Sequence, residues 1–145
     1  MKPSSRGFTL FELLVAISIA GIMTGMAWFS FKALDDPASD GAGQLMGLLK
    51  KGRSRALAST SAYTIKPLSV TKLQATYGTS CASATQTVDP TMALTLPSHA
   101  LLNDTTWTIC YNARGLSNSS SSILLHDDDS TRTIQVVLGG AVRVL

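Results

Sequence analysis

The sequence has 145 residues, of which 45% are hydrophobic and 14% are charged, and its formal net charge is +3. This composition is too apolar for a disordered chain, and the length leaves room for one small domain. Lys2 and Arg6 precede the first apolar segment, and without them ten basic residues face nine acidic ones. A globally basic surface that binds nucleic acid through many phosphates is therefore excluded, although a local basic patch is not.

An apolar segment runs from Phe8 to Phe31, with Glu12 as its one charge and no proline. As an α-helix it would be about 36 Å long, enough to cross a bilayer core of about 30 Å. The segment is too long for the apolar region of an ordinary signal peptide. The short basic stretch before it favours a cytoplasmic N-terminus. We therefore predict a single membrane-spanning helix with an exported C-terminal part.

A carboxylate inside such a segment costs about 3 kcal/mol at mid-helix depth, and less near an interface, unless it has a partner. The stretch Gly7-Phe8-Thr9-Leu10-Phe11-Glu12-Leu13-Leu14 resembles the class III signal of type IV prepilins and type II secretion pseudopilins. The resemblance implies that a prepilin peptidase cuts between Gly7 and Phe8 on the cytoplasmic face and that Phe8 is then N-methylated. Phe11 stands where the family usually has isoleucine.

The same resemblance makes Glu12 the fifth residue of the mature chain, where its carboxylate would neutralise the N-terminal amine of a neighbouring subunit. An unpaired carboxylate in an apolar filament core is unfavourable, so subunits that dock out of register would be rejected. We therefore expect Glu12 to set the assembly register. The alternative is an incidental charge at the membrane interface.

Asp35-Asp36-Pro37 follows the apolar segment and predicts a break, because proline disfavours helix at the residue before it. From about Asp40 to Ser59 the sequence again has helical periodicity. The basic residues of this stretch fall largely outside the apolar stripe, so we predict an amphipathic helix that packs on a sheet. The stripe consists of Leu45, Leu48, Leu49, Gly52 and Ala56.

Beyond Ala62 the chain is rich in threonine, valine and isoleucine, in runs separated by turn residues, which favours short strands. The last two runs flank Gly139-Gly140 and predict a two-residue hairpin. The predicted strands are Tyr63 to Leu68, Lys72 to Tyr77, Met92 to Leu96, Thr106 to Tyr111, Ser122 to His126, Arg132 to Leu138 and Ala141 to Leu145.

A long N-terminal helix followed by a second helix and an antiparallel sheet resembles the type IV pilin fold, which is α+β. The corresponding parts are a leader at residues 1–7, a hydrophobic N-terminal helix at 8–36, and a periplasmic or extracellular head at 37–145. The segments Leu48 to Ala56 and Tyr111 to Leu116, with the terminal hairpin, further resemble the minor pilins and pseudopilins of the FimT, FimU and GspH group. Members of this group typically help to start or cap a filament, and some bind DNA.

Cys81 and Cys110 are the only cysteines, and neither lies in a motif typical of redox or zinc sites. A disulfide is the first interpretation, and it needs an oxidising compartment, which agrees with export. Closing a loop of about 30 residues would stabilise the head by about 3 to 4 kcal/mol in the chain-entropy model. Two unpaired structural cysteines are the alternative.

DNA-binding members carry a C-terminal Gly-Arg-x-Arg turn, and the corresponding stretch is Gly140-Ala141-Val142-Arg143, in which alanine replaces one arginine. Phosphate affinity accumulates through several cations, so this loss weakens the case for DNA binding. A second set of cations on the predicted second helix favours a solvated helix face, and no aromatic residues interleave with it. The candidate DNA contacts are Arg143, Lys50, Lys51, Arg53 and Arg55.

His126-Asp127-Asp128-Asp129 offers oxygen ligands for calcium, but its spacing is not that of an EF-hand, and a polar turn between strands is favoured. Ser117 to Ser122 is expected to be a flexible loop, open to glycosylation. No catalytic motif accompanies the histidines His99 and His126. We expect no enzyme activity, no cofactor and no metal.

The sequence therefore predicts a minor pilin of a type IV pilus. It would be a single-pass protein of the bacterial inner membrane before assembly, and part of a periplasmic or cell-surface filament afterwards. Its partners would be other pilins, contacted through the N-terminal helix, the prepilin peptidase and the inner membrane. The alternatives are a GspH-type pseudopilin of a type II secretion system, a DNA-binding minor pilin for natural transformation, and a membrane-anchored exported enzyme.

Overall fold

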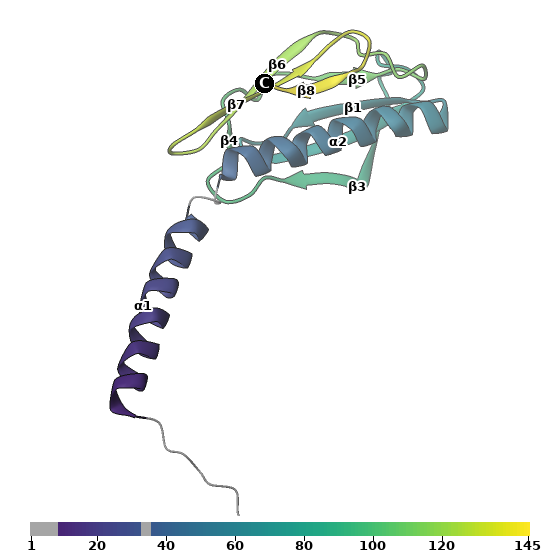
Figure 1. Ribbon diagram of the computed structural model, residues 1–145. Helices are drawn as coiled ribbons and strands as arrows, with labels where there is room; N and C mark the ends of the chain where they lie inside the picture. Colours follow the sequence, from purple (N-terminus) through teal and green to yellow (C-terminus); the bar gives the residue numbers. More distant parts are fainter. Residues whose placement is uncertain (1–8, 33–35) are drawn as a thin grey trace, which may run out of the picture. The chain divides into compact units, whose positions relative to one another are not determined.

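The computed structural model describes residues 9–32 and 36–145, and its contacts divide the chain into two compact units, Met1–Asp35 and Asp36–Leu145. The first unit contains the helix α1, Leu10–Lys32 (Figure 1). The Thr9 hydroxyl caps this helix by accepting a hydrogen bond from the Glu12 N–H at 3.2 Å. Apolar side chains from Leu10 to Met23 are exposed.

None of the helices in the described part of the chain is long and apolar enough for a membrane crossing. The predicted span from Phe8 to Phe31 includes residues outside the described ones and stays a prediction.

The second unit, called the head below, begins with the helix α2, Pro37–Ser59. The Asp36 carboxylate caps α2 by accepting a hydrogen bond from the Ser39 N–H at 2.9 Å. The predicted start at about Asp40 was therefore three residues too late. Proline is compatible with the first turn of a helix, where its missing N–H is not needed.

Eight strands complete the head and form two four-stranded antiparallel sheets, with strand orders β3-β2-β1-β5 and β4-β6-β7-β8 (Figure 1). The α+β class and the helix packed on antiparallel strands are confirmed, whereas the expected single sheet is divided in two. Residues 103–108 carry the chain from β4 in one sheet to β5 in the other. The strands are β1 Ala62–Pro67, β2 Lys72–Gly78, β3 Thr87–Thr95, β4 Leu101–Leu102, β5 Ile109–Tyr111, β6 Ser121–His126, β7 Thr131–Val136 and β8 Val142–Val144.

Two strands differ clearly from their predicted bounds, and a third was not predicted. The strand β3 begins at Thr87 instead of Met92, and a bulge interrupts its pairing with β2 between Gln74 and Ala75. The strand β5 is shorter than expected, and the two-residue strand β4 is too short to be recognised from its sequence.

The terminal hairpin has a three-residue loop, Leu138 to Gly140, instead of the predicted two-residue loop. The Val137 N–H donates to the Ala141 carbonyl at 3.1 Å, and the Gly140 N–H donates to the Val137 carbonyl at 2.8 Å. Gly140 has a φ of 77°, which suits the left-handed residue of this loop type.

The core lies between α2 and the two sheets, which contribute Ile65, Leu73, Leu125 and Ile134 among other fully buried side chains. A Cβ atom on Gly52 would lie 2.6 Å from Ile65 Cδ1, so glycine allows α2 to approach β1 closely. The predicted apolar stripe of α2 is buried, as Leu45, Leu48, Leu49, Gly52 and Ala56 all are.

Candidate functional site

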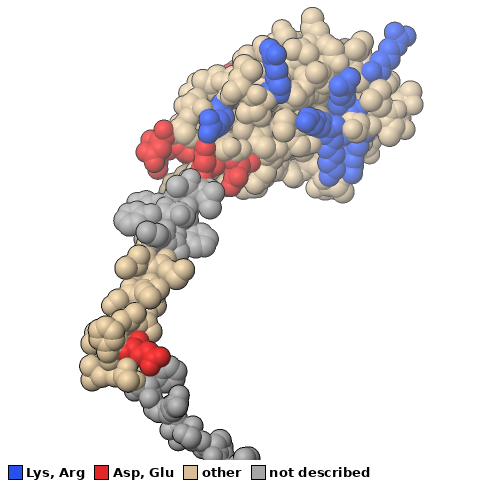
Figure 2. Space-filling view, viewed as in Figure 1, with Lys and Arg blue, Asp and Glu red and all other residues tan. Residues whose placement is uncertain are grey.

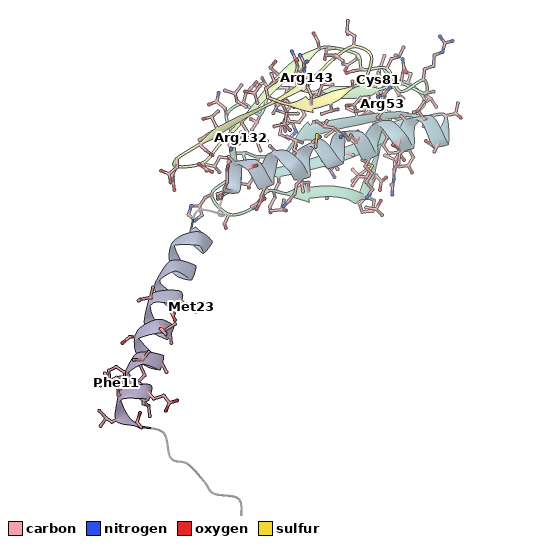
Figure 3. The ribbon with its side chains drawn as sticks, viewed as in Figure 1. Phe11, Met23, Arg53, Cys81, Arg132 and Arg143 are labelled. Atoms are coloured by element: carbon pink, nitrogen blue, oxygen red, sulfur yellow. A yellow bond between two sulfur atoms is a disulfide. The ribbon has the colours of Figure 1, made fainter. Side chains whose placement is uncertain are left out.

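The predicted assembly residues lie at the N-terminus. Gly7 and Phe8 are outside the described residues, whereas Glu12 lies in the first turn of α1 and is exposed. Phe11, beside it, is also exposed (Figure 3). The sequence Thr9-x-x-Glu12 has the spacing of a capping box, and the structure shows one of its two bonds, from the Glu12 N–H to the Thr9 hydroxyl.

Charged side chains of the head gather in separate places. Figure 2 shows most of the visible Lys and Arg side chains toward the right end of the head and the acidic ones toward its left end. The head, Asp36–Leu145, holds nine basic and seven acidic residues. On the face that Figure 2 shows, the two signs are therefore partly separated, although the net charge of the head is small.

Two of the predicted DNA-contact residues hold the β3 bulge to α2. Lys51 Nζ donates a hydrogen bond to the Thr91 carbonyl at 3.0 Å, and Arg55 forms an ion pair with Asp89. Asp89 is 7% exposed, and its carboxylate also accepts hydrogen bonds from the Thr91 hydroxyl at 2.7 Å and the Thr91 N–H at 3.0 Å. The Thr91 hydroxyl is the main cause that lowers the pKa of Asp89, and burial opposes it. Lys51 and Arg55 are thus engaged within the head.

The other predicted DNA-contact residues have different surroundings (Figure 3). Arg143 on β8 is exposed, but its Nε donates to Gln135 Oε1 at 2.7 Å and its Nη2 donates to the same oxygen. Lys50 is exposed on α2. Arg53 Nε is buried and has no hydrogen-bond partner among the described residues.

Arg53 lies under two turns that meet above α2. A Cβ on Gly140 would lie 3.0 Å from Arg53 Nε and 2.0 Å from the Gly115 carbonyl oxygen, so only glycine fits there. Gly115 in turn faces Leu57 of α2. Burial raises the pKa of Tyr111 to about 12, and the positive charge of Arg53 opposes this shift.

The start of α2 is tied to the turn between β6 and β7 by a polar network that the sequence did not reveal. Asp36 forms an ion pair with Arg132 at 2.6 Å and accepts a hydrogen bond from the Ser130 hydroxyl at 3.1 Å. Asp127 accepts hydrogen bonds from the N–H groups of Ala38 at 3.0 Å, Asp129 at 2.8 Å and Ser130 at 2.6 Å. These contacts join segments about 90 residues apart in sequence.

The segment His126 to Asp129 belongs to the same network and leads from β6 into the turn before β7, as predicted. Backbone N–H groups surround the Asp127 carboxylate, first that of Asp129 and then that of Ala38, and they lower its pKa to about 2. These donors bond both oxygens of the Asp127 carboxylate. Within residues 9–32 and 36–145, no group of three or more acidic, histidine or cysteine side chains is placed to hold a metal.

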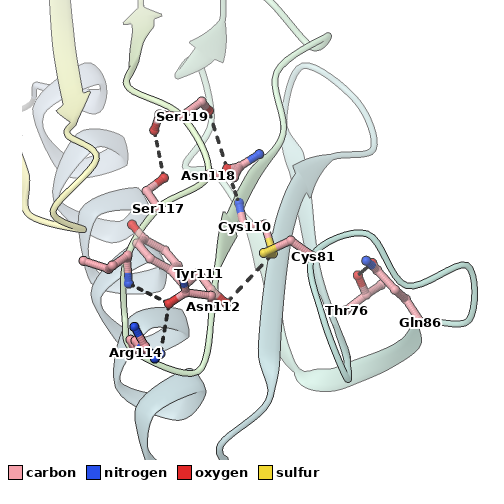
Figure 4. The surroundings of a disulfide bond; sticks show 11 residues. Thr76, Cys81, Gln86, Cys110, Tyr111, Asn112, Arg114, Ser117, Asn118 and Ser119 are labelled. Atoms are coloured by element: carbon pink, nitrogen blue, oxygen red, sulfur yellow. Dashed lines mark hydrogen bonds between the residues drawn. A yellow bond between two sulfur atoms is a disulfide. The ribbon is translucent and has the colours of Figure 1, made fainter.

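A disulfide joins Cys81, in the β2–β3 connection, to Cys110 of β5, with the Cα atoms 5.8 Å apart (Figure 4). Asn118 closes the free edge of β5, because its N–H donates to the Cys110 carbonyl and its Oδ1 accepts from the Cys110 N–H, both at 2.9 Å. The predicted loop from Ser117 to Ser122 was therefore wrong in part. Ser117 pairs with Tyr111 of β5, Asn118 is bonded to Cys110, and β6 begins at Ser121.

Beside the disulfide lies an open hollow of about 460 Å³. Its wall includes Thr79, Ser80, Asn112 and Arg114 next to apolar groups. Of the predicted site residues, Cys81 alone lines this hollow.

Comparison with known proteins gives one sequence match and several structural ones. Residues 2–28 match the family described as the prokaryotic N-terminal methylation motif. No curated protein matches the sequence.

Among solved structures, the type IV minor pilin FimU of Pseudomonas aeruginosa aligns in two crystal forms, with TM-scores of 0.60 and 0.59 and 14% identity. These alignments cover 74% of this chain and 87% or 91% of FimU. The minor pseudopilin EpsH from the type 2 secretion system of Vibrio cholerae aligns with a TM-score of 0.55 and 12% identity, over 76% of this chain and 97% of EpsH. At these identities the alignments establish the fold. The chain thus joins a prokaryotic N-terminal methylation motif to the fold of a minor pilin and a minor pseudopilin.

Proposed function

We propose that the chain is a minor pilin of a type IV pilus, made as a prepilin, cut between Gly7 and Phe8 by a prepilin peptidase and N-methylated at Phe8. The observation that carries this proposal is that the methylation motif at residues 2–28 precedes a head with the pilin fold. Before assembly the N-terminal segment anchors the chain in the inner membrane, with the N-terminus in the cytoplasm. After assembly the head faces the periplasm or the cell surface.

In the filament, α1 packs against the N-terminal helices of other pilins, and Glu12 neutralises the terminal amine of a neighbour. Two features support this role. The side chains of Glu12 and Phe11 are exposed in their own unit, so both are accessible to another subunit. An apolar helix with an exposed carboxylate in its first turn favours a partner that buries the apolar surface and supplies a positive charge.

The near alternative is a GspH-type pseudopilin of a type II secretion system. The likeness to EpsH supports it, and its TM-score is close to that of FimU. Deleting the gene for this chain from its host distinguishes a pilin from a pseudopilin. A pilus subunit is needed for surface filaments and twitching, whereas a pseudopilin is needed for release of exported enzymes.

DNA binding during natural transformation is a weaker alternative. Arg143 lies in the terminal hairpin and Arg53 lies beside its Gly140, which favours a phosphate contact there. Against this, the guanidinium of Arg143 is bonded to Gln135, and Lys51 and Arg55 are bonded to β3. Of the five predicted contacts, Lys50 and Arg53 are then left, whereas affinity for DNA accumulates through several cations.

The experiment that tests the proposal is intact-mass measurement of the chain expressed with and without a prepilin peptidase, beside the variant Gly7→Glu. We expect the peptidase to remove residues 1–7 from the natural chain and to leave the variant uncut. A chain that keeps residues 1–7, or that is cut beyond Phe31, would contradict the proposal and favour a plain membrane anchor or a secreted protein.

A further inference from the structure

The open hollow beside the disulfide lies between two connections of the head, one from β2 to β3 and one from β5 to β6. The disulfide ties the two walls together, because Cys81 lies in the first connection and Cys110 lies in β5. The volume of about 460 Å³ is within the range of about 300 to 1,000 Å³ that is typical of small-molecule sites. The polar side chains of the wall are Thr79, Ser80, Asn112, Arg114 and Asn118.

Two asparagine amides of this wall have their orientation set by the backbone. Asn112 Oδ1 accepts hydrogen bonds from the Arg114 N–H at 2.9 Å and the Leu116 N–H at 3.1 Å. Asn118 Oδ1 accepts one from the Cys110 N–H at 2.9 Å (Figure 4). Each amide oxygen is thus used as an acceptor, which leaves the NH₂ group as a donor. Neither NH₂ group has a partner among the described residues.

The charge of the wall has one sign. Among the described residues that line the hollow, Arg114 is the one cation and none is acidic. Arg114 is exposed, and its guanidinium has no ion-pair partner in the described part of the chain. The hydroxyls of Thr79 and Ser80 donate and accept. Donors therefore outnumber acceptors among these side chains, which favours an anionic ligand rich in oxygen.

Apolar groups line the rest of the hollow. They include Ala62, Ala113 and the exposed Leu116. A simple oxyanion such as phosphate would engage the donors and leave these apolar groups in water. A sugar acid matches both parts of the wall, because its carboxylate and hydroxyls are acceptors and the C–H groups of its ring cover apolar surface.

We propose that this hollow binds the carboxylate-bearing sugar unit of an acidic polysaccharide. The carboxylate accepts hydrogen bonds from Arg114 and the two asparagine NH₂ groups, and the ring lies against Leu116. The ring hydroxyls bond Thr79 and Ser80. The hollow is open, so the units on either side of the bound sugar extend into solvent. The biological role of the site rests on the proposed function, since export brings the head to the cell surface, whereas binding itself does not.

The test is an NMR titration of the full-length chain, expressed with a prepilin peptidase and held in mild detergent. The side-chain NH₂ signals of Asn112 and Asn118 report on the hollow directly. The probes are glucuronate, its neutral match glucose, and inorganic phosphate. We expect glucuronate to shift both signals to saturation and to bind about tenfold more tightly than glucose or phosphate, the ratio that 1.4 kcal/mol produces.

Two results of this titration would overturn the proposal. One is that neither asparagine signal moves with glucuronate. The other is that glucose or phosphate binds as tightly as glucuronate, because the hollow would then not recognise the carboxylate and the sugar ring together.

Two charge-removing variants provide matched arms. Arg114→Gln should abolish the preference for glucuronate over glucose and leave the binding of glucose unchanged. Lys50→Gln removes an exposed cation of α2 that does not line the hollow, and it should keep the tenfold preference. Backbone amide signals away from the substitution show whether each variant is folded. Equal loss of the preference in the two variants would show attraction to the net charge of the head and would overturn the site.

Intact mass of the same samples keeps this test separate from the proposed function. A processed chain that does not bind glucuronate overturns only the site in the hollow. An unprocessed chain that binds glucuronate supports the site and overturns the proposed function.

Discussion

Replacing Asp89 by alanine should destabilise the head, because this carboxylate holds the β3 bulge to α2. Asp89 is 7% exposed, and its loss removes the ion pair with Arg55 and both hydrogen bonds from Thr91. An exposed ion pair contributes up to about 1 kcal/mol, whereas breaking a buried one costs about 3 to 5 kcal/mol. The Arg55 side chain is 36% exposed and regains water, so we expect a loss of about 2 to 3 kcal/mol in the free energy of unfolding.

The assay is denaturant and thermal unfolding of the full-length protein in mild detergent. For a head of this size, about 4 °C per kcal/mol lowers the melting temperature by about 8 to 12 °C. Asp128→Ala is the matched control, because its side chain is 89% exposed, and it should change stability by less than about 0.5 kcal/mol. A double-mutant cycle with Arg55→Ala should show coupling of at least about 0.5 kcal/mol. If Asp89→Ala lowers the free energy of unfolding no more than Asp128→Ala does, Asp89 does not hold the bulge to α2. Arg55 would then be available for other partners.

Three further predictions concern the turns, the polar network and the disulfide. Gly140→Ala should lower the free energy of unfolding by about 1 to 3 kcal/mol, because the new Cβ would lie 2.0 Å from the Gly115 carbonyl oxygen and the backbone has a φ of 77°. Gly139→Ala is the control and should be nearly neutral, because its Cβ would have no atom within 4 Å. Equal effects of the two variants in denaturant unfolding would contradict the close packing of the two turns. The pKa of Asp127 is lowered to about 2, and that of Asp36 is also lowered. The two ionised carboxylates therefore stabilise the folded head fully above about pH 4, and this stabilisation is lost as the pH falls toward 2. Thermal unfolding between pH 2 and 5 should show this loss, and Asp127→Asn should reduce it; an unchanged pH profile would refute the network. Replacing Cys81 and Cys110 by alanine should cost about 3 to 4 kcal/mol in denaturant unfolding, and unfolding insensitive to this change would show that the closed loop adds no stability.

Local signals were enough to predict part of the fold. The apolar stripe of α2 lies at helical spacing, and the Thr- and Val-rich runs became strands. Two further signals were available but were not used, namely the capping-box spacing of Thr9 and Glu12 and the Asp36-Pro37 pair that starts α2. Both depend on contacts within one turn of helix.

The roles of single charged residues could not be predicted in the same way. Arg55 reads as part of a solvated helix face, but its partner Asp89 is 34 residues away and lies on a bulge. Asp36 and Arg132 are 96 residues apart. Such pairs join parts of the chain that only the folded structure brings together, so periodicity along the chain gives no sign of them.

The proposed function requires the processed chain to enter a filament through α1 and Glu12. Mass spectrometry of filaments and inner membranes isolated from the host tests it most directly, for the natural chain and for Gly7→Glu and Glu12→Ala. We predict that filaments hold the natural chain without residues 1–7 and with a methylated Phe8, and that both variants stay in the membrane, Glu12→Ala in processed form. Filaments that lack the natural chain, or that contain the uncut Gly7→Glu chain, would contradict assembly through a processed N-terminus.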